Sequence, residues 1–221
     1  DIKQFQYNSF TTAFGMGKSP LAIVANPKSK INTSAELAKL VKETNKPITF
    51  AIGGGAHRMA YEFFMLKAKG NKEQVKFTQF PGPLQAVTAV ASDAGIEFGI
   101  MPIAVAKPLV DAGKVKAIGF TGTRKMAQYP EVPLLNTVAP GINVYAAWSI
   151  ELPANTPKEI VAWYQTEFAA AIRSKEYKEW RDLNVVFYEE SELTPAGLRK
   201  HMDELRATFL PVLKKIDINK D

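Results

Sequence analysis

The sequence predicts an α/β fold with a mostly parallel sheet, and two observations carry this prediction. Over residues 20–121, short apolar runs of the kind that form buried strands alternate with segments whose apolar residues recur at helical spacing. The connections between these segments are short. Strands that alternate with helices through short connections are typical of a parallel sheet.

Five strands are expected in this region. They cover residues 20–27, 48–52, 75–80, 96–101 and 115–121. The first, PLAIVANP, is an apolar run between two prolines and indicates a buried strand.

Four helical segments are expected between these strands. They cover residues 31–46, 56–70, 82–92 and 104–113. Thr33 and Glu36 have the spacing of a capping box and predict where the first helix begins. The apolar face of the second helix is predicted at Met59, Phe63 and Leu66. Gly70 is placed to end that helix.

The pattern changes beyond the fifth strand. Residues 122–142 hold three prolines and two glycines with little periodicity, so a long surface connection is expected. A strand over 143–152 follows, and then a helix with Thr156 as its predicted cap and Pro157 at its first position. A further helix, a strand over 184–189 and a last helix complete the chain. Because helices outnumber strands here, we interpret this part as an α/β unit with an incomplete sheet.

The composition excludes several kinds of site. The 221-residue chain has no cysteine, which excludes disulfides, thiolate metal sites and cysteine nucleophiles. No His, Asp and Glu set has zinc-ligand spacing, and neither a metal nor a cofactor is expected. No apolar run reaches the length of about 18 residues that a membrane span needs. The net charge of +6 comes from scattered basic residues, which favours a solvated surface over a nucleic-acid site and is compatible with anionic small ligands.

One segment has the character of a ligand site. Gly53, Gly54, Gly55, Ala56 and His57 join a predicted strand to a predicted helix. Consecutive glycines allow the backbone to approach a ligand closely. The first N–H groups of a helix have no internal partner and lie at the positive end of its dipole. The segment therefore predicts an anion site, with a tight turn that needs positive φ angles as the alternative.

The composition of this segment excludes three familiar motifs. It lacks the Gly-Lys-Ser/Thr ending of a phosphate loop, the spacing of the dinucleotide fingerprint and the Gly-x-Ser-x-Gly of a hydrolase elbow. His57 has no recognisable catalytic partner, and His201 lies in the last predicted helix, where a solvated face is expected. A binding role for His57 is therefore favoured over acid–base catalysis, and no catalytic residue is expected.

Three further residues are candidates for ligand contact. Met101 ends the strand predicted over 96–101 and Pro102 follows it, and ligands in open α/β sheets lie beyond the carboxyl ends of strands. Core packing is the alternative for both. Trp148 is either a core aromatic residue or a cleft wall that stacks on a flat ligand.

The order of five stretches resembles a known family. They are SPLAIVANPKSKINTSAELAKLVKET, ITFAIGGGAHRMAYEFF, LVDAGKVKAIGFTGTRK, YPEVPLL and WSIELPANTPKEIV. From about residue 5 to residue 214, the chain resembles the Bug receptors, the periplasmic solute-binding proteins of tripartite tricarboxylate transporters.

The resemblance implies a type II periplasmic-binding-protein fold, a two-lobe clamshell with mixed, mostly parallel sheets. It implies an organic carboxylate held between the lobes, one carboxylate group lying on the backbone amides and small polar groups of residues 53–57. The implied partners are the membrane permease subunits of the transporter, with no nucleic acid and no direct membrane insertion, and the implied location is the periplasm. A carboxylate-sensing module coupled to a signalling partner is the alternative.

Departures from the family pattern sharpen these expectations. The loop has no serine or threonine before His57, so its contacts are expected from backbone N–H groups. Met101 stands where the family often has an aspartate, which implies a less polar ligand tail, and Phe80 replaces a tyrosine.

Family members also carry a further stretch before the equivalent of Asp1, which supplies most of the first lobe. Residues 16–118 are therefore expected to form a complete second lobe. Residues 1–15 and 119–221 are expected to form a partial first lobe with the crossover segments.

Overall fold

The computed structural model describes residues 9–92 and 94–213. The chain divides into two compact units. Unit 1 comprises Asp1–Lys18 and Ala147–Leu210, and unit 2 comprises Ser19–Ala146 and Pro211–Asp221. The assignment of residues to two lobes made from the sequence stays a prediction.

The sheet of unit 2 is mixed. Its strands are β1 (Phe10–Ala25), β2 (Ile48–Ile52), β3 (Val75–Gln79), β4 (Phe98–Pro102) and β5 (Lys116–Phe120). They lie in the order β3-β2-β4-β1-β5. β2 runs parallel to β3 and β4, whereas β1 is antiparallel to both β4 and β5. Because β1 is antiparallel to both β4 and β5, β5 runs in the same direction as β2, β3 and β4, in line with the mostly parallel sheet that the sequence predicts.

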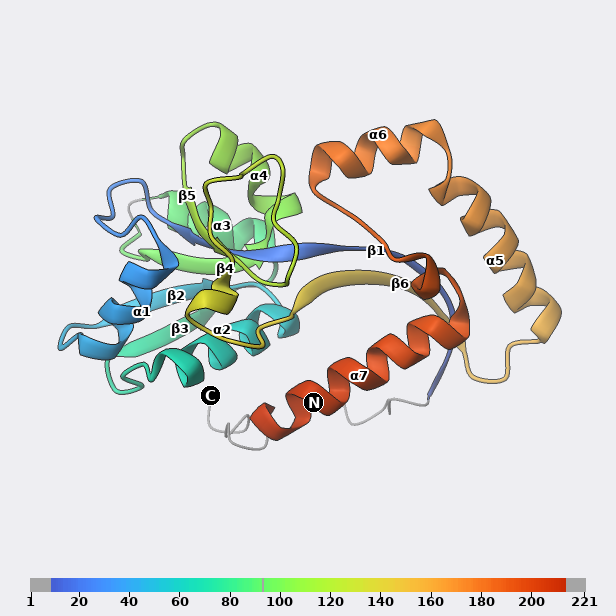
Figure 1. Cartoon of the computed structure of the whole chain (residues 1–221), viewed down its shortest axis with the longest axis horizontal. Coiled ribbons are helices and arrows are strands. Elements are labelled where there is room, and N and C mark those ends of the chain that lie inside the picture. Colours follow the sequence, from blue (N-terminus) through green and yellow to red (C-terminus); the bar gives the residue numbers. More distant parts are fainter. Residues whose placement is uncertain (1–8, 93, 214–221) are drawn as a thin grey trace. The chain divides into compact units, whose positions relative to one another are not determined.

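Helices cover both faces of this sheet (Figure 1). They are α1 (Ser34–Glu43), α2 (Gly55–Ala68), α3 (Pro83–Ala91) and α4 (Ile103–Asp111). The β2–α2–β3 and β3–α3–β4 crossovers run in opposite directions across the sheet, so right-handed connections place α2 and α3 on opposite faces. In agreement, α1 packs beside α2, and α3 beside α4. The carboxyl ends of β2, β3 and β4 share one edge of the sheet, where α2, α3 and α4 begin, whereas α1 follows β1 at the opposite edge.

Aromatic side chains fill the core of unit 2. Phe50 and Phe98 lie on the neighbouring strands β2 and β4 with their ring centroids 5.5 Å apart, and both are fully buried. Tyr61 of α2 contacts Phe50 with its ring edge, and its hydroxyl donates a 3.1 Å hydrogen bond to the carbonyl of Val75. Each buried aromatic side chain of this kind contributes about 1.5–3 kcal/mol to stability.

The sequence predicted where α1 begins and where α2 ends, and one of these two predictions is confirmed. The capping box of α1 is confirmed: Thr33 Oγ1 accepts the Glu36 N–H at 3.2 Å, and Glu36 Oε2 accepts the Thr33 N–H at 3.2 Å. The predicted end of α2 is wrong by one residue, because Lys69 takes the left-handed conformation with φ 54°. A Cβ on Gly70 would lie 2.4 Å from Met65 Cε, so a side chain there would require the flexible Met65 side chain to shift.

The predicted apolar face of α2 is wrong at its last position. Leu66 is 39% exposed, whereas Phe64 is fully buried. The helix packs against both α1 and β4. Its buried arc is therefore wider than a single stripe and includes Ala60, Phe63 and Phe64.

Residues 122–142 are irregular, as predicted, but they do not form a surface connection. A short 3-10 helix, η1 (Leu135–Thr137), interrupts them. Six apolar side chains of the segment are buried in unit 2: Met126, Tyr129, Val132, Leu135, Ala139 and Ile142. The Tyr129 hydroxyl donates a 2.7 Å hydrogen bond to Asp111 of α4, which fixes the segment to that helix. Spaced apolar residues thus anchor a segment whose prolines prevent regular structure.

Unit 1 is built from helices and two long strands. Its elements after the first part of β1 are β6 (Tyr145–Pro153), α5 (Lys158–Ile172), α6 (Lys175–Asn184), η2 (Glu190–Leu193) and α7 (Pro195–Leu213). β6 pairs with β1. Phe14, Ile172 and Leu193 form its small core.

Two predictions in unit 1 are wrong. The strand over 184–189 is absent, because α6 extends to Asn184 and Val185 turns the chain at φ 57°. Of these six residues, only Phe187 pairs with β1, through two backbone hydrogen bonds to Lys18 of 2.7 and 3.0 Å. Thr156 does not cap α5, since its hydroxyl donates to the carbonyl of Pro153 at 2.7 Å.

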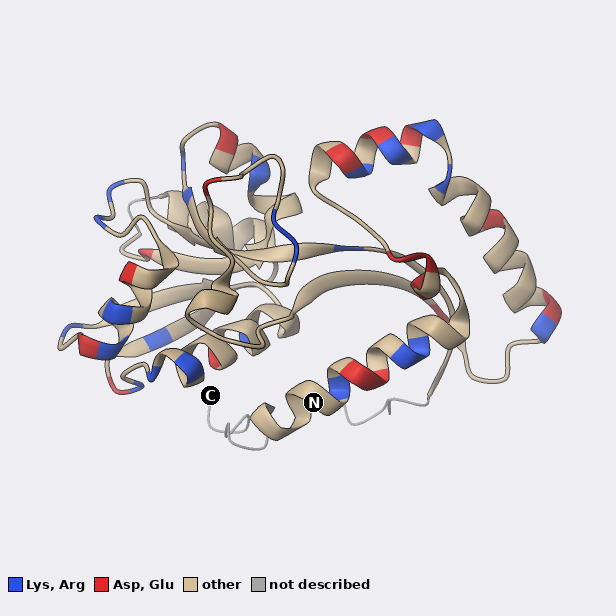
Figure 2. Ribbon diagram, in the orientation of Figure 1, with Lys and Arg blue, Asp and Glu red and all other residues tan. Residues whose placement is uncertain are grey.

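Charges of both signs alternate along α6 and α7 (Figure 2). Large apolar side chains are exposed on the same unit: Trp148, Ile160, Trp163, Trp180, Leu183 and Leu210. Within the described residues, no helix is both long and apolar enough to cross a membrane.

Candidate functional site

Residues 53–57, here called the glycine loop, lead from β2 into α2. Gly54 is the N-cap of the helix and has an extended backbone with φ 171° and ψ 168°. None of the three glycines has a φ in the left-handed region. The tight-turn alternative therefore does not explain why the loop consists of glycine.

Steric crowding requires glycine at one of the three positions and does not require it at the other two. A Cβ on Gly53 would lie within 2.4 to 2.5 Å of the backbone of Gly82 and Pro83, so only glycine fits there. A Cβ on Gly55 would meet no atom within 4 Å. A Cβ on Gly54 would meet the His57 ring at 3.4 Å. The glycine loop thus leaves room above the helix start that packing within unit 2 does not require.

The first turn of α2 offers free donors. Gly54 has no side chain to cap the helix, and the first internal hydrogen bond runs from the Arg58 N–H to the Gly54 carbonyl at 3.0 Å. The N–H groups of Gly55, Ala56 and His57 have no partner in the described part of the chain. Such donors, together with the helix dipole, are suited to an anion, and an anion site here remains a prediction.

His57 lies at this helix start and is neutral at physiological pH. Its side chain is only 5% exposed, and burial lowers its pKa from 6.5 to about 4. Its Nδ1 is buried and has no hydrogen-bond partner among the described residues. A buried polar nitrogen without a partner costs free energy. The neutral imidazole is therefore suited to exchange a hydrogen bond with a ligand, and it has no acidic neighbour to make it a catalytic base.

A second helix start lies against the glycine loop; the helix itself was predicted over residues 82–92, but a role for its start in the site was not. α3 begins with Gly82 as its N-cap and Pro83 at the first position, and no side chain caps it. Gly82 is the residue against which Gly53 packs, and the Phe80 N–H donates to the Ile52 carbonyl at 2.7 Å. The only signal in the sequence is a Gly-Pro pair directly after a predicted strand, as at a helix N-terminus.

The structure places Met101 and Pro102 in the interior of unit 2. Met101 is 0% exposed, and Pro102 is buried as well. The core-packing alternative describes both side chains. The start of α4 is also occupied, because the Ala104 N–H donates to the buried Ser19 Oγ at 3.3 Å. A direct ligand contact by either residue remains a prediction.

Trp148 belongs to β6 in unit 1, whereas the glycine loop belongs to unit 2. Its side chain is 39% exposed, so the core alternative does not describe it. Stacking on a ligand remains a prediction for this residue.

The nearest charged groups on α2 are paired with one another. Arg58 Nε lies 2.9 Å from Glu62 Oε1, and its guanidinium lies 3.8 Å from the centroid of the Phe77 ring. Lys72 Nζ approaches the other Glu62 oxygen at 3.3 Å. Arg58 and Lys72 therefore share the single carboxylate of Glu62.

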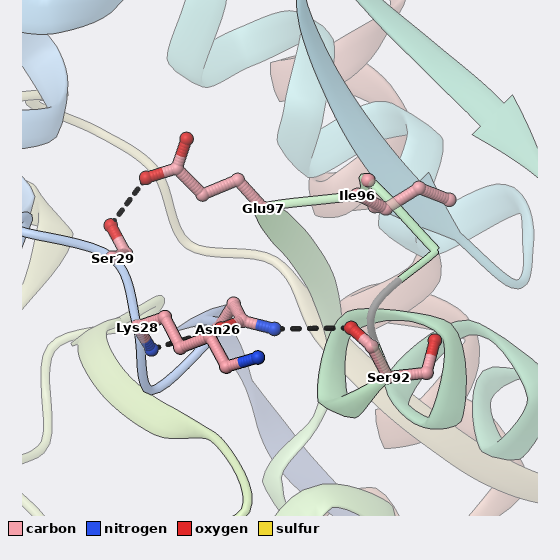
Figure 3. Close-up of a pocket in the computed structure, with 7 residues that line it drawn as sticks. Asn26, Lys28, Ser29, Ser92, Ile96 and Glu97 are labelled. Atoms are coloured by element: carbon pink, nitrogen blue, oxygen red, sulfur yellow. Dashed lines mark hydrogen bonds between the residues drawn. The ribbon is translucent and has the colours of Figure 1, made fainter.

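A cavity of about 310 Å³ lies near the opposite edge of the sheet, where β1 ends and β4 begins (Figure 3). Its polar groups bond one another. Asn26 Nδ2 donates to the carbonyls of Val90 and Ser92 at 2.8 and 3.2 Å, and Ser29 Oγ donates to Glu97 Oε1 at 2.5 Å. The Glu97 carboxylate on its wall disfavours an anion. This cavity is a weaker candidate than the glycine loop.

Titratable clusters elsewhere do not form a catalytic or metal site. In residues 9–92 and 94–213, no group of three His, Cys, Asp or Glu residues could hold a metal ion. The solvated face expected for His201 is wrong, because its Nδ1 lies 3.3 Å from Glu192 Oε1 and its side chain is largely buried. The same oxygen accepts a 2.6 Å bond from the buried Lys18 ammonium. This cluster ties β1 to η2 within unit 1.

Comparison with known proteins identifies one protein family whose sequence pattern matches most of this chain. The sequence pattern of the tripartite tricarboxylate transporter family receptors (TctC) matches residues 3–193. A curated relative, the UPF0065 protein in the tcbD-tcbE intergenic region of Pseudomonas sp. (strain P51), is 24% identical over 162 residues, which are 72% of this chain and 48% of that protein. The chain thus spans about half the length of this relative.

Solved structures with the same fold include three binding proteins. MatC (Rpa3494) from Rhodopseudomonas palustris with bound malate has a TM-score of 0.86 at 18% identity, over 96% of this chain and 72% of that one. R. palustris Rpa4515 with adipate has a TM-score of 0.82 at 17% sequence identity, and the match covers 94% of this chain and 68% of that one. The periplasmic binding protein BugD has a TM-score of 0.83 at 18% sequence identity, and the match covers 95% of this chain and 70% of that one. At these identities the likeness shows the fold, and the predicted class of periplasmic-binding-protein fold is confirmed.

Proposed function

Because the chain belongs to the tripartite tricarboxylate transporter receptor family, we propose that it is a periplasmic solute receptor. It captures an organic carboxylate and delivers it to the permease subunits of a tripartite transporter. It performs no chemistry on the solute. The glycine loop lies in unit 2, within the segment 16–118 that we assign to the second lobe.

The observation that carries this proposal is the uncapped start of α2. Three N–H groups of its first turn have no partner in the described residues, a Cβ on Gly55 would meet nothing within 4 Å, and the buried neutral imidazole of His57 lies over Gly54. A carboxylate at a helix N-terminus gains about 0.3–1 kcal/mol from the dipole alone, and more where the site is partly buried. Its charge-assisted hydrogen bonds to backbone N–H groups contribute further. A receptor that must release its solute is well served by a site without a strong countercharge.

The class of solute is supported by the relatives and by the loop. Two structural relatives hold adipate and malate, which are both dicarboxylates. In this chain the loop offers donors and no negative group, which fits a carboxylate group and disfavours a cation.

Isothermal titration of the 221-residue chain with acetate, succinate, malate and adipate tests the proposal. We expect saturable binding of at least one of these carboxylates. The matched control is succinamide, in which neutral amides replace the carboxylates and for which no binding is expected. Failure of all four carboxylates to bind would contradict the proposed function.

A further inference from the structure

We propose that the start of α3, with the side chain of Gln85, is the second wall of the carboxylate site. The site is then built from two helix starts rather than from the glycine loop alone. This inference rests on the proposed function and specifies which groups of unit 2 take part in it.

The four helices of unit 2 separate into two kinds by how they begin. α1 is capped by Thr33 Oγ1, and at the start of α4, which has no side-chain cap, the Ala104 N–H donates to Ser19 Oγ. α2 and α3 have glycine N-caps, Gly54 and Gly82, and no side-chain cap. An N-cap oxygen normally accepts the N–H groups of the first turn. At α2 and α3 the acceptor must come from outside the described residues.

The third residue after the N-cap also differs between α1 on the one hand and α2 and α3 on the other. In α1 it is Glu36, whose carboxylate reaches back to the N-cap. In α2 and α3 it is His57 and Gln85, which are uncharged and able to donate hydrogen bonds. A glutamate there would repel a bound carboxylate, whereas an imidazole or an amide can bind it.

Both of these side chains fold back over their glycine. The His57 ring lies 3.4 Å from where a Cβ of Gly54 would be, and the Gln85 carboxamide oxygen lies 2.9 Å from the equivalent position at Gly82. The Gln85 side chain is exposed, and its carboxamide makes no hydrogen bond within residues 9–92 and 94–213. Rotation of this carboxamide presents the NH₂ group to the same space.

The two helix starts lie side by side. Gly53 and Gly82 are in direct backbone contact, and the Phe80 N–H donates to the Ile52 carbonyl at 2.7 Å. Because α2 and α3 cover opposite faces of the sheet, their positive ends converge at the shared edge from two sides. One carboxylate group, with two oxygens, can accept from both starts.

His57 provides the independent sign of a ligand. It is only 5% exposed, its Nδ1 has no partner in the described part of the chain, and its ring lies over Gly54 at the start of α2. Most buried polar atoms in folded proteins have a partner. A carboxylate bound between the starts supplies one by accepting a hydrogen bond from Nδ1–H.

The test compares Gln85→Ala and Gln85→Glu with the wild-type chain, using the same four carboxylates. The control is Asn45→Asp, which adds the same charge at an exposed position before β2, at the other edge of the sheet. For the carboxylate that binds the wild type, we expect Gln85→Ala to raise Kd about threefold to tenfold, the loss of one hydrogen bond. We expect Gln85→Glu to raise Kd by more than about tenfold, and Asn45→Asp to leave Kd unchanged within about twofold.

Thermal unfolding distinguishes a local effect from misfolding. A glutamate in the first turn interacts favourably with the helix dipole, so Gln85→Glu should keep or raise Tm while it weakens binding. Wild-type affinity in both Gln85 variants would overturn the inference and leave the proposed function standing. An absence of carboxylate binding by the wild type would overturn both.

Discussion

Gly53 packs against Gly82 so closely that a Cβ on Gly53 would lie 2.4 Å from the Gly82 carbonyl carbon. The two glycines follow neighbouring parallel strands, β2 and β3, and each precedes a helix that no side chain caps. This contact brings the starts of α2 and α3 together at the carboxyl edge of the sheet. The proposed binding of a carboxylate between the two helix starts depends on that arrangement.

Replacing Gly53 by alanine is expected to destabilise unit 2. The added methyl group meets backbone atoms that cannot move away, and overpacking of this kind costs about 1–3 kcal/mol. Chemical denaturation measures the change. Gly55→Ala is the matched control, because a Cβ there meets nothing within 4 Å. Equal stability of the two variants would contradict the packing role of Gly53.

Replacing Gly54 by aspartate supplies the missing cap. The carboxylate is expected to accept the first N–H groups of α2 and to stabilise the helix by a few tenths of a kcal/mol over glycine. It also occupies the place of the proposed ligand, so carboxylate affinity should fall by about tenfold or more. Denaturation measures the expected rise in stability, and calorimetry on the same preparation measures the expected fall in carboxylate affinity. An unchanged affinity would show that the ligand does not bind there.

The stability of the protein is expected to fall with pH below 6.5 because of His57. Burial lowers its folded pKa from 6.5 to about 4, so the unfolded chain binds a proton that the folded chain resists. The contribution of the neutral ring is present above pH 6.5 and is lost as the pH falls towards 4. The loss amounts to on the order of 3 kcal/mol.

Denaturation of the wild type and of His57→Gln between these pH values measures this contribution, because glutamine does not titrate. The difference in unfolding free energy between the two proteins should narrow or reverse as the pH falls. Parallel pH profiles would contradict the assignment of the effect to His57.

The buried ion pair between Lys18 and Glu192 is expected to contribute more to the free energy of unfolding than the exposed ion pair between Arg173 and Glu190. Glu192→Gln removes the carboxylate 2.6 Å from the Lys18 ammonium, with side-chain exposures of 7% and 11%, and should cost about 3–5 kcal/mol. Glu190→Gln, in the same short helix, removes the exposed partner of Arg173 and should cost about 0–1 kcal/mol. Similar unfolding free energies for the two variants would contradict this difference.

Local sequence patterns predicted the parts of the fold that depend on neighbouring residues. Thr33 and Glu36 form the capping box that their spacing indicates, since both partners lie within one turn. The strand over 48–52 has the predicted bounds. The end of α2 at Lys69 and the absent strand over 184–189 were not predictable, because packing elsewhere in each unit decides them.

The candidate site was half predictable. The glycine loop stands out in the sequence because three glycines precede a helix. The role of Gly82 is not visible, because it comes from a contact between two loops that are 29 residues apart in number, 53 to 82. Met101 was chosen for its place after a strand, but its side chain points into the core, a direction that strand position alone does not decide.

Backbone amide chemical shifts during a carboxylate titration test the proposed binding site most directly. With the ¹⁵N-labelled chain and acetate, succinate, malate and adipate, we expect the largest saturable changes at Gly55, Ala56 and His57 and at Leu84 and Gln85. Changes centred instead on the cavity near Asn26 and Glu97, or no saturable change anywhere, would contradict a carboxylate site at the two helix starts.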